Sequence, residues 1–365
     1  SRLVRGRTLL LAVFCLSALT ACAELRYYLQ SAQGQWDISA RKQPIDEYLA
    51  DDDASRQALA PGLRRVQQAR LFAINRLALP ASQSYTAYAD VERDYAVKNL
   101  FAAGEFSTQL YSWCYPVIGC ASYRGYFDEA MLADEQQVMK DRGYDTYVAK
   151  IPAYSTLGWF DDPVLNTVID YPEEQLVSLI FHELAHQQLY VEGDTTFNES
   201  FASAVEQAGV RLWCQSENRP QQWRHYLQKQ NRQQQLYRLV LGIRQDLEQI
   251  YQQAITAEEK RAAKQQRLQQ AQQEYRQLKN TGQLDAAYDN WFAQGLNNAK
   301  LGTVSAYNQH VEAFLAMLAG VNEDFPAFYS LAAAIGELDE EARNTCLQHW
   351  RKNPERVPPE CRPAA

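Results

Sequence analysis

The sequence offers little basic charge to a polyanionic partner. Its 365 residues include 36 lysines and arginines against 44 aspartates and glutamates, so the formal net charge is −8 at pH 7. No dense cluster of basic residues stands out along the chain. A basic patch is the usual electrostatic footprint of nucleic-acid binding, so we do not expect nucleic acid as a partner.

The apolar run at the N-terminus is too short to be a membrane-spanning helix. It covers only 8–19, whereas a transmembrane helix needs roughly 20 apolar residues. The run follows Arg2, Arg5 and Arg7 and is followed by small residues, which is the order of a signal peptide. We therefore predict that 1–22 is a signal peptide.

The end of this segment suggests lipidation. Leu19, Thr20, Ala21 and Cys22 resemble the lipobox of bacterial lipoproteins, in which the cysteine becomes the lipidated first residue of the mature chain. We predict lipidation of Cys22, with ordinary secretion as the alternative. Because Ala23 rather than aspartate follows, the resemblance implies a periplasm-facing lipoprotein in the outer membrane of a Gram-negative bacterium.

Cysteine is present but forms no CxxC motif, so a metal site built from cysteines is not expected. Export permits disulfides instead. Cys114 and Cys120 flank a short loop with proline and glycine and are the first predicted pair, and Cys346 with Cys361 is the second. An odd cysteine, Cys214, is left over.

The mature chain has the element order of an α+β protein. Residues 23–94 are predicted to form a helical region, with a break at 51–53 and a stop at Pro61 and Gly62. Residues 95–218 are predicted to hold the catalytic core, and 282–365 a C-terminal helical region that completes the domain.

Strands and helices alternate within the predicted core. The pattern predicts a strand over 95–106, a helix over 127–143, and strand-like structure over 147–160 with a bend at Pro152. Pro172 then precedes a helix that carries the histidine motif described below.

Residues 219–281 differ from the core because glutamine, arginine and lysine surround narrow apolar seams. A capping-box sequence at 256–259 separates the two seams. We predict a long antiparallel helical hairpin, which either stabilises the domain as a solvated arm or binds an envelope partner. The first seam steps by four and three residues through Leu236, Val240, Ile243, Leu247 and Ile250.

Histidine is scarce, with five in the whole chain, yet His182 and His186 are only four residues apart. On a helix this spacing puts both rings on one face, within reach of one ion. Glu183 lies between them in sequence but is rotated around the helix, so it can meet a water rather than the ion. This is the HExxH arrangement of two ligands and a general base.

Catalytic zinc takes three protein ligands and keeps one position open. Asn198 and Glu199 are predicted to open a second helix, and Gly193 is placed to end the first one. If the chain turns back in between, Glu199 can face both histidines and complete a Zn²⁺ site. Glu206, two turns later, is expected to matter far less for metal affinity.

The motifs H-E-L-A-H-Q and N-E-S-F-A-S-A-V-E resemble those of gluzincin metallopeptidases, especially aminopeptidases. With the lipobox, W-C-Y-P-V-I-G-C, Y-S-T-L-G-W-F-D-D-P and L-N-N-A-K-L, the mature chain resembles the proteobacterial family of predicted aminopeptidase lipoproteins. The resemblance implies a zincin-like core with a small sheet, His182, His186 and Glu199 as metal ligands, and Glu183 as catalytic base. The His186-to-Glu199 gap is shorter than in well-known gluzincins, and the Gly-x-Met-Glu-Asn strand of the aminopeptidases is absent. The motifs therefore specify a zinc peptidase more directly than an aminopeptidase.

Other groups are candidates for supporting roles. Tyr307 is a candidate oxyanion donor, with core packing as its alternative. Asp161 and Asp162 are candidates for binding a substrate ammonium group, or simply begin a turn. The segment containing Ser155, Thr156, Leu157 and Gly158 is a candidate edge strand for an extended peptide substrate, or an ordinary core strand.

The leading hypothesis is a membrane-anchored zinc peptidase of the periplasm, specifically an aminopeptidase. The alternative is a non-catalytic envelope adaptor with a structural zinc and a helical arm that binds a partner. Glu183 favours the enzyme, because a structural zinc site has no need of a general base.

Overall fold

The computed structural model describes residues 24–115, 119–153, 156, 160–304 and 309–362. Several positions singled out from the sequence lie outside the described residues, and their predicted roles remain predictions: Cys22, Ser155, Leu157, Gly158 and Tyr307.

The N-terminal region is helical only in part. A helix over 24–40 is followed by the short strand β1 (Gln43–Pro44), α2 (Ile45–Ala50) and α3 (Ala54–Arg76). The predicted break at 51–53 separates α2 from α3, and Asp53 caps α3 by accepting a hydrogen bond from the Ser55 amide. The chain then leaves helical structure and enters strand β2 (Ala87–Ala89).

The predicted helix stop at Pro61 and Gly62 is wrong, because both residues lie inside α3. Proline there gives up a backbone hydrogen bond, but packing compensates. A Cβ added at Gly62 would come within 2.9 Å of the Ile169 carbonyl oxygen, so the missing side chain permits a close approach. The buried face of α3 consists of Ala60, Leu63, Val66, Ala69 and Ala73.

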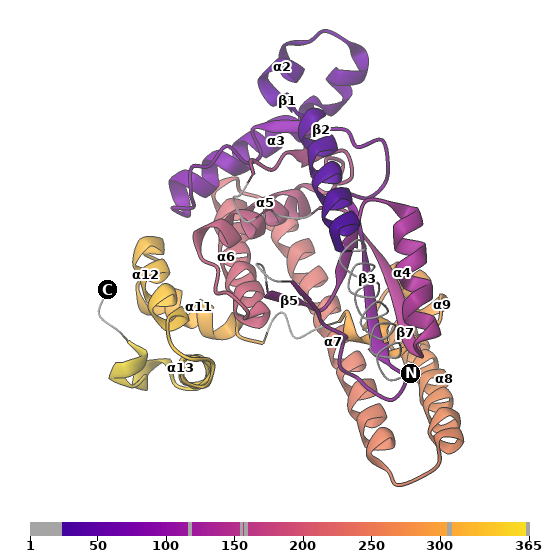
Figure 1. The fold of residues 1–365 in the computed structure, drawn as a ribbon. Helices are drawn as coiled ribbons and strands as arrows, with labels where there is room; N and C mark the ends of the chain where they lie inside the picture. Colours follow the sequence, from indigo (N-terminus) through magenta and orange to yellow (C-terminus); the bar gives the residue numbers. More distant parts are fainter. Residues whose placement is uncertain (1–23, 116–118, 154–155, 157–159, 305–308, 363–365) are drawn as a thin grey trace, which may run out of the picture.

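The strands form small sheets. β6 (Arg124–Tyr126), β3 (Val97–Gly104) and β7 (Tyr144–Ile151) are antiparallel in that order, while β1, β2 and β8 (Val164–Leu165) form another sheet. Side chains alternate along β3, so Leu100 and Ala102 pack towards α4 (Glu129–Asp141). Phe101 and Ala103 pack instead towards Ala299 in α10 (Asn298–Gly302). The fold is therefore α+β, with helices against both faces of this sheet (Figure 1).

Strand β7 differs from the sequence prediction at both ends. It begins at Tyr144, directly after Gly143 with φ +82°, and it ends before Pro152. The strand expected to continue over 153–160 is not formed by Ala153, Thr156 or Phe160, the residues of that stretch that the structure describes.

Helices α5 (Glu173–Gln188) and α6 (Thr195–Ser216) pack side by side and carry the predicted site. α6 begins three residues earlier than the predicted Asn198, because the Asp194 side chain caps it by accepting from the Phe197 amide at 2.9 Å. The turn between the helices includes Gly193 with φ +80°. This turn brings α6 back along α5.

The hairpin consists of α7 (Pro220–Gln252) and α8 (Ala257–Asn280), and the turn that connects them projects at one end of the molecule (Figure 1). Nearer the core, Lys264 of α8 pairs with Asp145 of β7. Thr256 and Glu259 form the predicted capping box. The η1 turn (Ala286–Tyr288) and α9 (Asp289–Ala293) lead from the hairpin into α10. The buried seam consists of Leu236, Val240, Ile243, Leu247, Tyr251, Ala271 and Tyr275.

The C-terminal region supplies the other side of the main core. α11 (Val311–Gly320), α12 (Phe325–Gly336) and α13 (Glu340–Lys352) pack around α6, followed by η2 (Pro354–Arg356) and η3 (Pro359–Cys361).

The cysteines pair as the sequence suggested. Cys346 is joined to Cys361, and Cys114 in β4 (Trp113–Tyr115) to Cys120 in β5 (Gly119–Ala121). Cys214 is a buried free thiol.

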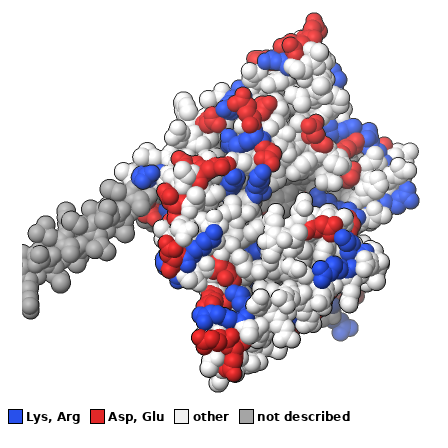
Figure 2. Space-filling model, turned by 90° about the vertical axis from the view of Figure 1, so that its right-hand side faces the viewer, with Lys and Arg blue, Asp and Glu red and all other residues white. Residues whose placement is uncertain are grey.

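Acidic and basic side chains are interspersed over the face of the molecule seen in Figure 2. No helix in the described part of the chain has the length and apolar character needed to cross a bilayer.

Candidate active site

The two motif histidines lie on one face of α5. Their Nε2 atoms are 3.2 Å apart and their rings are nearly perpendicular, with an interplanar angle of 82°. α5 can present them because its other sides are buried against the core. The apolar residues that bury α5 are Leu176, Val177, Ile180, Phe181, Leu184 and Ala185.

Glu199 reaches the same point from α6. Its Oε2 lies 3.2 Å from Nε2 of His182, and its Oε1 lies 3.6 Å from Nε2 of His186. The ligand atoms of the three residues all lie within 4.8 Å of one another. The structure therefore brings together the predicted triad, and this group could bind a metal ion.

The electrostatics of the triad suit a cation. Burial alone would lower the pKa of His182, but hydrogen bonds to Glu199 and Glu206 hold that pKa well above its usual value. Burial and the neighbouring His182 lower the pKa of His186 to about 4, so this ring is neutral and its Nε2 lone pair is available. Nε2 of His182 lies 3.2 Å from both the Glu199 carboxylate and Nε2 of His186. A metal ion in place of a proton on this nitrogen would bind both imidazoles and the carboxylate together.

Glu206 makes contacts beside the triad that the sequence did not predict. Its Oε2 lies 3.0 Å from Nδ1 of His182, and its Oε1 accepts from Ser178 at 2.7 Å and from Tyr226 at 3.0 Å. A carboxylate on the outer nitrogen fixes the proton there and leaves Nε2 free to bind a metal. The available signal was the seven-residue spacing from Glu199, which places both carboxylates on one face of α6.

The histidines are held differently. Nδ1 of His186 is buried and has no hydrogen-bond partner among the residues that the structure describes. His182 is therefore the histidine whose orientation the surrounding side chains fix.

Glu183 follows His182 directly on α5, so its position is rotated around the helix from that of the two histidines. Burial raises the pKa of its carboxyl to about 7, partly offset by the nearby His182. A cation at the triad would lower this pKa, because it would favour the charged carboxylate. A carboxyl group whose pKa can be tuned near neutrality suits a general base.

A second buried carboxyl, Asp162, lies near Glu183 and raises its pKa. Asp162 is only 5% exposed, and it accepts hydrogen bonds from the amide and hydroxyl of Thr156. Its backbone carbonyl accepts from Tyr85, a buried residue with an unusual φ of +62°. Thr156 is therefore hydrogen-bonded to Asp162 and is not itself part of a strand, and the edge strand proposed for its neighbours lies outside the described residues.

A cleft of about 880 Å³ opens beside the triad. His182, Glu199 and Glu206 line it together with residues of α7 and α11. Side-chain amides can both donate to and accept from a peptide backbone. The cleft is rich in such amides: Gln175, Gln207, Gln230, Asn231, Gln233, Gln234 and Gln309.

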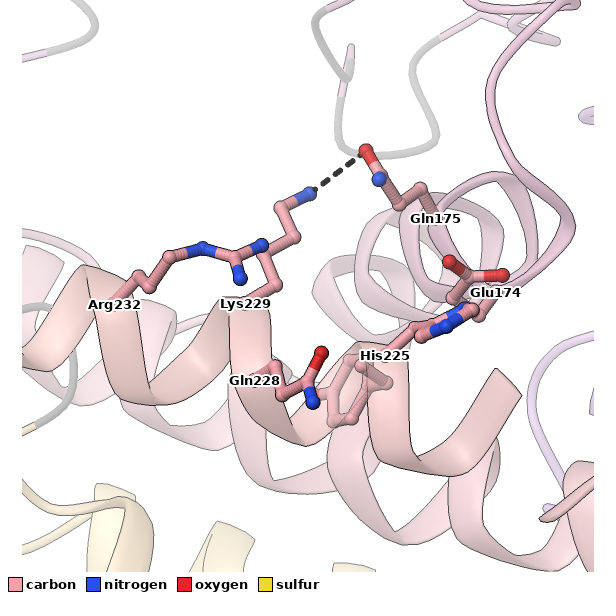
Figure 3. A pocket seen from close by; sticks show the side chains of 7 residues that line it. Glu174, Gln175, His225, Gln228, Lys229 and Arg232 are labelled. Atoms are coloured by element: carbon pink, nitrogen blue, oxygen red, sulfur yellow. Dashed lines mark hydrogen bonds between the residues drawn. The ribbon is translucent and has the colours of Figure 1, made fainter. Parts of the chain in front are cut away.

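A smaller cavity of about 250 Å³ adjoins the cleft between the start of α5 and α7 (Figure 3). Lys229 reaches across it from α7, and its Nζ donates to Oε1 of Gln175 at 3.2 Å. Tyr226, Gln175 and Lys229 line both spaces, so the cavity continues from the cleft. The first helix of the hairpin is thus a wall of the site. Binding of an envelope partner to the hairpin 219–281 stays a prediction.

Comparison with protein families finds a match over most of the chain. A family model described as "Putative aminopeptidase" matches residues 26–347, which is most of the chain and includes the triad, Glu183 and the hairpin. No curated protein and no solved structure matches the chain.

Proposed function

The chain belongs to the family described as "Putative aminopeptidase", and from this membership and the triad we propose that it is a zinc-dependent aminopeptidase. The observation that carries the proposal is the convergence of His182, His186 and Glu199 within 4.8 Å at the edge of a large cleft. A peptidase family implies a peptide substrate, and the amide-rich cleft offers the hydrogen bonds that a peptide backbone needs.

The ligand set supports zinc over magnesium or calcium. Two imidazoles and one carboxylate, with a fourth position open, are the ligands of catalytic zinc sites. Magnesium and calcium favour sites made of oxygen ligands. The cleft gives a substrate access to the triad, because His182 and Glu199 both line it.

The chain's own residues would divide the work of peptide hydrolysis. When bound, Zn²⁺ would polarise the scissile carbonyl and lower the pKa of a water towards about 7. Glu183 accepts the proton of the attacking water and passes it to the leaving amine. Glu206 holds the Nδ1 proton of His182, so that Nε2 stays unprotonated through the cycle. The predicted oxyanion donor Tyr307 lies outside the described residues and stays a prediction.

We place this activity in the periplasm, on a protein anchored to the outer membrane through a lipid on Cys22. The lipobox-like sequence supports the anchor. The disulfides Cys114–Cys120 and Cys346–Cys361 support an oxidising compartment, because disulfides are rare in the reducing cytosol.

A peptide library with paired free and acetylated N-termini tests the proposed function. The purified protein loaded with one equivalent of zinc is incubated with the library, and products are identified by mass spectrometry. We expect removal of single residues from free N-termini and no cleavage of acetylated peptides. Cleavage inside both sets would make the protein an endopeptidase. Absence of any cleavage by the fully loaded protein would favour the non-catalytic adaptor.

A further inference from the structure

A stripe of apolar side chains is exposed along one side of the helix over 24–40. Leu25, Tyr28, Leu29 and Trp36 are 59%, 42%, 60% and 76% exposed. At 3.6 residues per turn these positions fall on one face together with Ala32, which is also exposed. The four are part of ten large hydrophobic residues exposed in the described ranges, and the other six are scattered singly. Clustering of this kind marks a binding surface rather than ordinary surface composition.

The opposite face of the helix is fixed against the protein. Gln30 donates to the Gly125 carbonyl at 3.2 Å and accepts from the Phe127 amide at 2.9 Å. Gly34 lies against the Phe127 ring so closely that an added Cβ would come within 2.1 Å of it. The helix therefore cannot rotate to bury Leu25, Leu29 and Trp36, and they stay turned outward.

We propose that this apolar face docks on a lipid bilayer, an inference that rests on the proposed lipid anchor at Cys22. Leu25 follows Cys22 by three residues, and three residues of chain reach about 10 Å at most. The polar headgroup layer of one leaflet is itself roughly 5–8 Å deep. A lipid on Cys22 would thus hold the start of this helix at the bilayer surface.

The exposed side chains have the chemistry of an interfacial helix. Tryptophan and tyrosine prefer the headgroup level of a membrane, and leucines can enter the boundary of the acyl chains. The flanking charges do not make a basic surface, because Glu24 pairs with Arg124 and Asp37 pairs with Arg41. Docking should therefore depend on apolar burial and little on salt or anionic lipid. The lipid on Cys22 and the apolar face of the helix would both contact the bilayer, and together they would fix the orientation of the molecule on the membrane.

Fluorescence quenching by brominated lipids tests the docking. The full protein purified from membranes is reconstituted into vesicles whose acyl chains carry bromine near the headgroup. Trp36 is the exposed tryptophan among the described residues, so we expect Trp36→Phe to lose most of the tryptophan quenching. Trp223→Phe is the matched control, because Trp223 lies on α7 and should contribute no quenching. Equal quenching of the wild-type and Trp36→Phe proteins would overturn the proposal.

A second variant separates docking from the anchor and from the activity. Leu25→Gln/Leu29→Gln, which keeps Trp36 as the reporter, should keep the lipid on Cys22 and full peptidase activity in detergent, yet lose the quenching of Trp36. If the full protein carries the lipid on Cys22 but Trp36 is not quenched, docking is refuted and the lipid anchor is supported. If the purified protein carries no lipid on Cys22 but Trp36 is still quenched, the lipid anchor is refuted and docking is supported. If the protein is a dimer in solution and the double variant is a monomer, a second copy covers this face. That result would also refute docking on the bilayer.

Discussion

Nδ1 of His182 lies 3.0 Å from Oε2 of Glu206, while Nε2 of the same ring lies 3.2 Å from Oε2 of Glu199. One imidazole is thus held between two carboxylates that lie two turns apart on α6. The pair of contacts assigns separate roles: Glu206 keeps the proton on the outer nitrogen, and Glu199 shares the inner position that a metal would occupy.

Glu199→Gln should lower zinc affinity by more than the about 10–100-fold typical of an outer partner, because it removes a charged ligand from the ion. Glu192→Gln is the matched control, since Glu192 precedes α6 in the turn and is absent from the triad. A competitive zinc titration of both variants gives the ranking. If Glu192→Gln lost zinc while Glu199→Gln kept it, the third ligand would be assigned wrongly.

Glu206→Gln should weaken zinc binding by about 10–100-fold, because the neutral amide orients His182 less strongly. Tyr226→Phe removes one hydrogen bond to Glu206 and should have a smaller effect in the same direction. Tyr237→Phe, on the same helix and lining the same cleft, should leave zinc affinity unchanged. Equal zinc affinity of wild type and Glu206→Gln would contradict the role of Glu206.

The sequence predicted the position of Glu199 in the site but not the contacts of Glu206. A fixed helical spacing was enough to pair His182 with His186, and a turn signal at Gly193 was enough to bring Glu199 towards them. The contacts of Glu206 depend on the rotation of α6 about its axis and on Tyr226, which comes from the next helix, α7, 20 residues further along the chain. The seven-residue spacing puts Glu206 on the same face as Glu199, but it does not show which nitrogen of His182 each carboxylate meets. Pro61 misled the prediction for a related reason, because the tertiary packing of α3 outweighs the local preference of proline.

Gly209→Ala should destabilise the fold and reduce activity. An added Cβ would come within 2.7 Å of Leu77 and of Phe181, so α6 would have to move away from α5. Overpacking of this kind costs about 1–3 kcal/mol, which exceeds the helix propensity that alanine gains. Gly242→Ala in α7 is the control, because a Cβ there meets nothing within 4 Å and should stabilise the protein by up to about 1 kcal/mol. Denaturant unfolding of both variants measures the difference, and an equal gain in both would contradict the tight α5–α6 contact.

Cys22→Ser should abolish the lipid anchor, since a serine hydroxyl cannot take the place of the acylated thiol. We expect an uncleaved precursor or a soluble species in place of the mature membrane protein. Cell fractionation with mass analysis of the N-terminal peptide measures the outcome. Mature Cys22→Ser protein in the outer membrane would refute the lipobox interpretation.

Zinc content and peptide hydrolysis measured together on Glu183→Gln test the central claim most directly. In the proposed site His182, His186 and Glu199 hold the metal and Glu183 is the base, so this variant should still bind about one zinc per chain and lose nearly all hydrolysis. Loss of zinc together with activity would make Glu183 part of the metal site. Activity equal to that of the wild-type protein would remove it from the chemistry altogether.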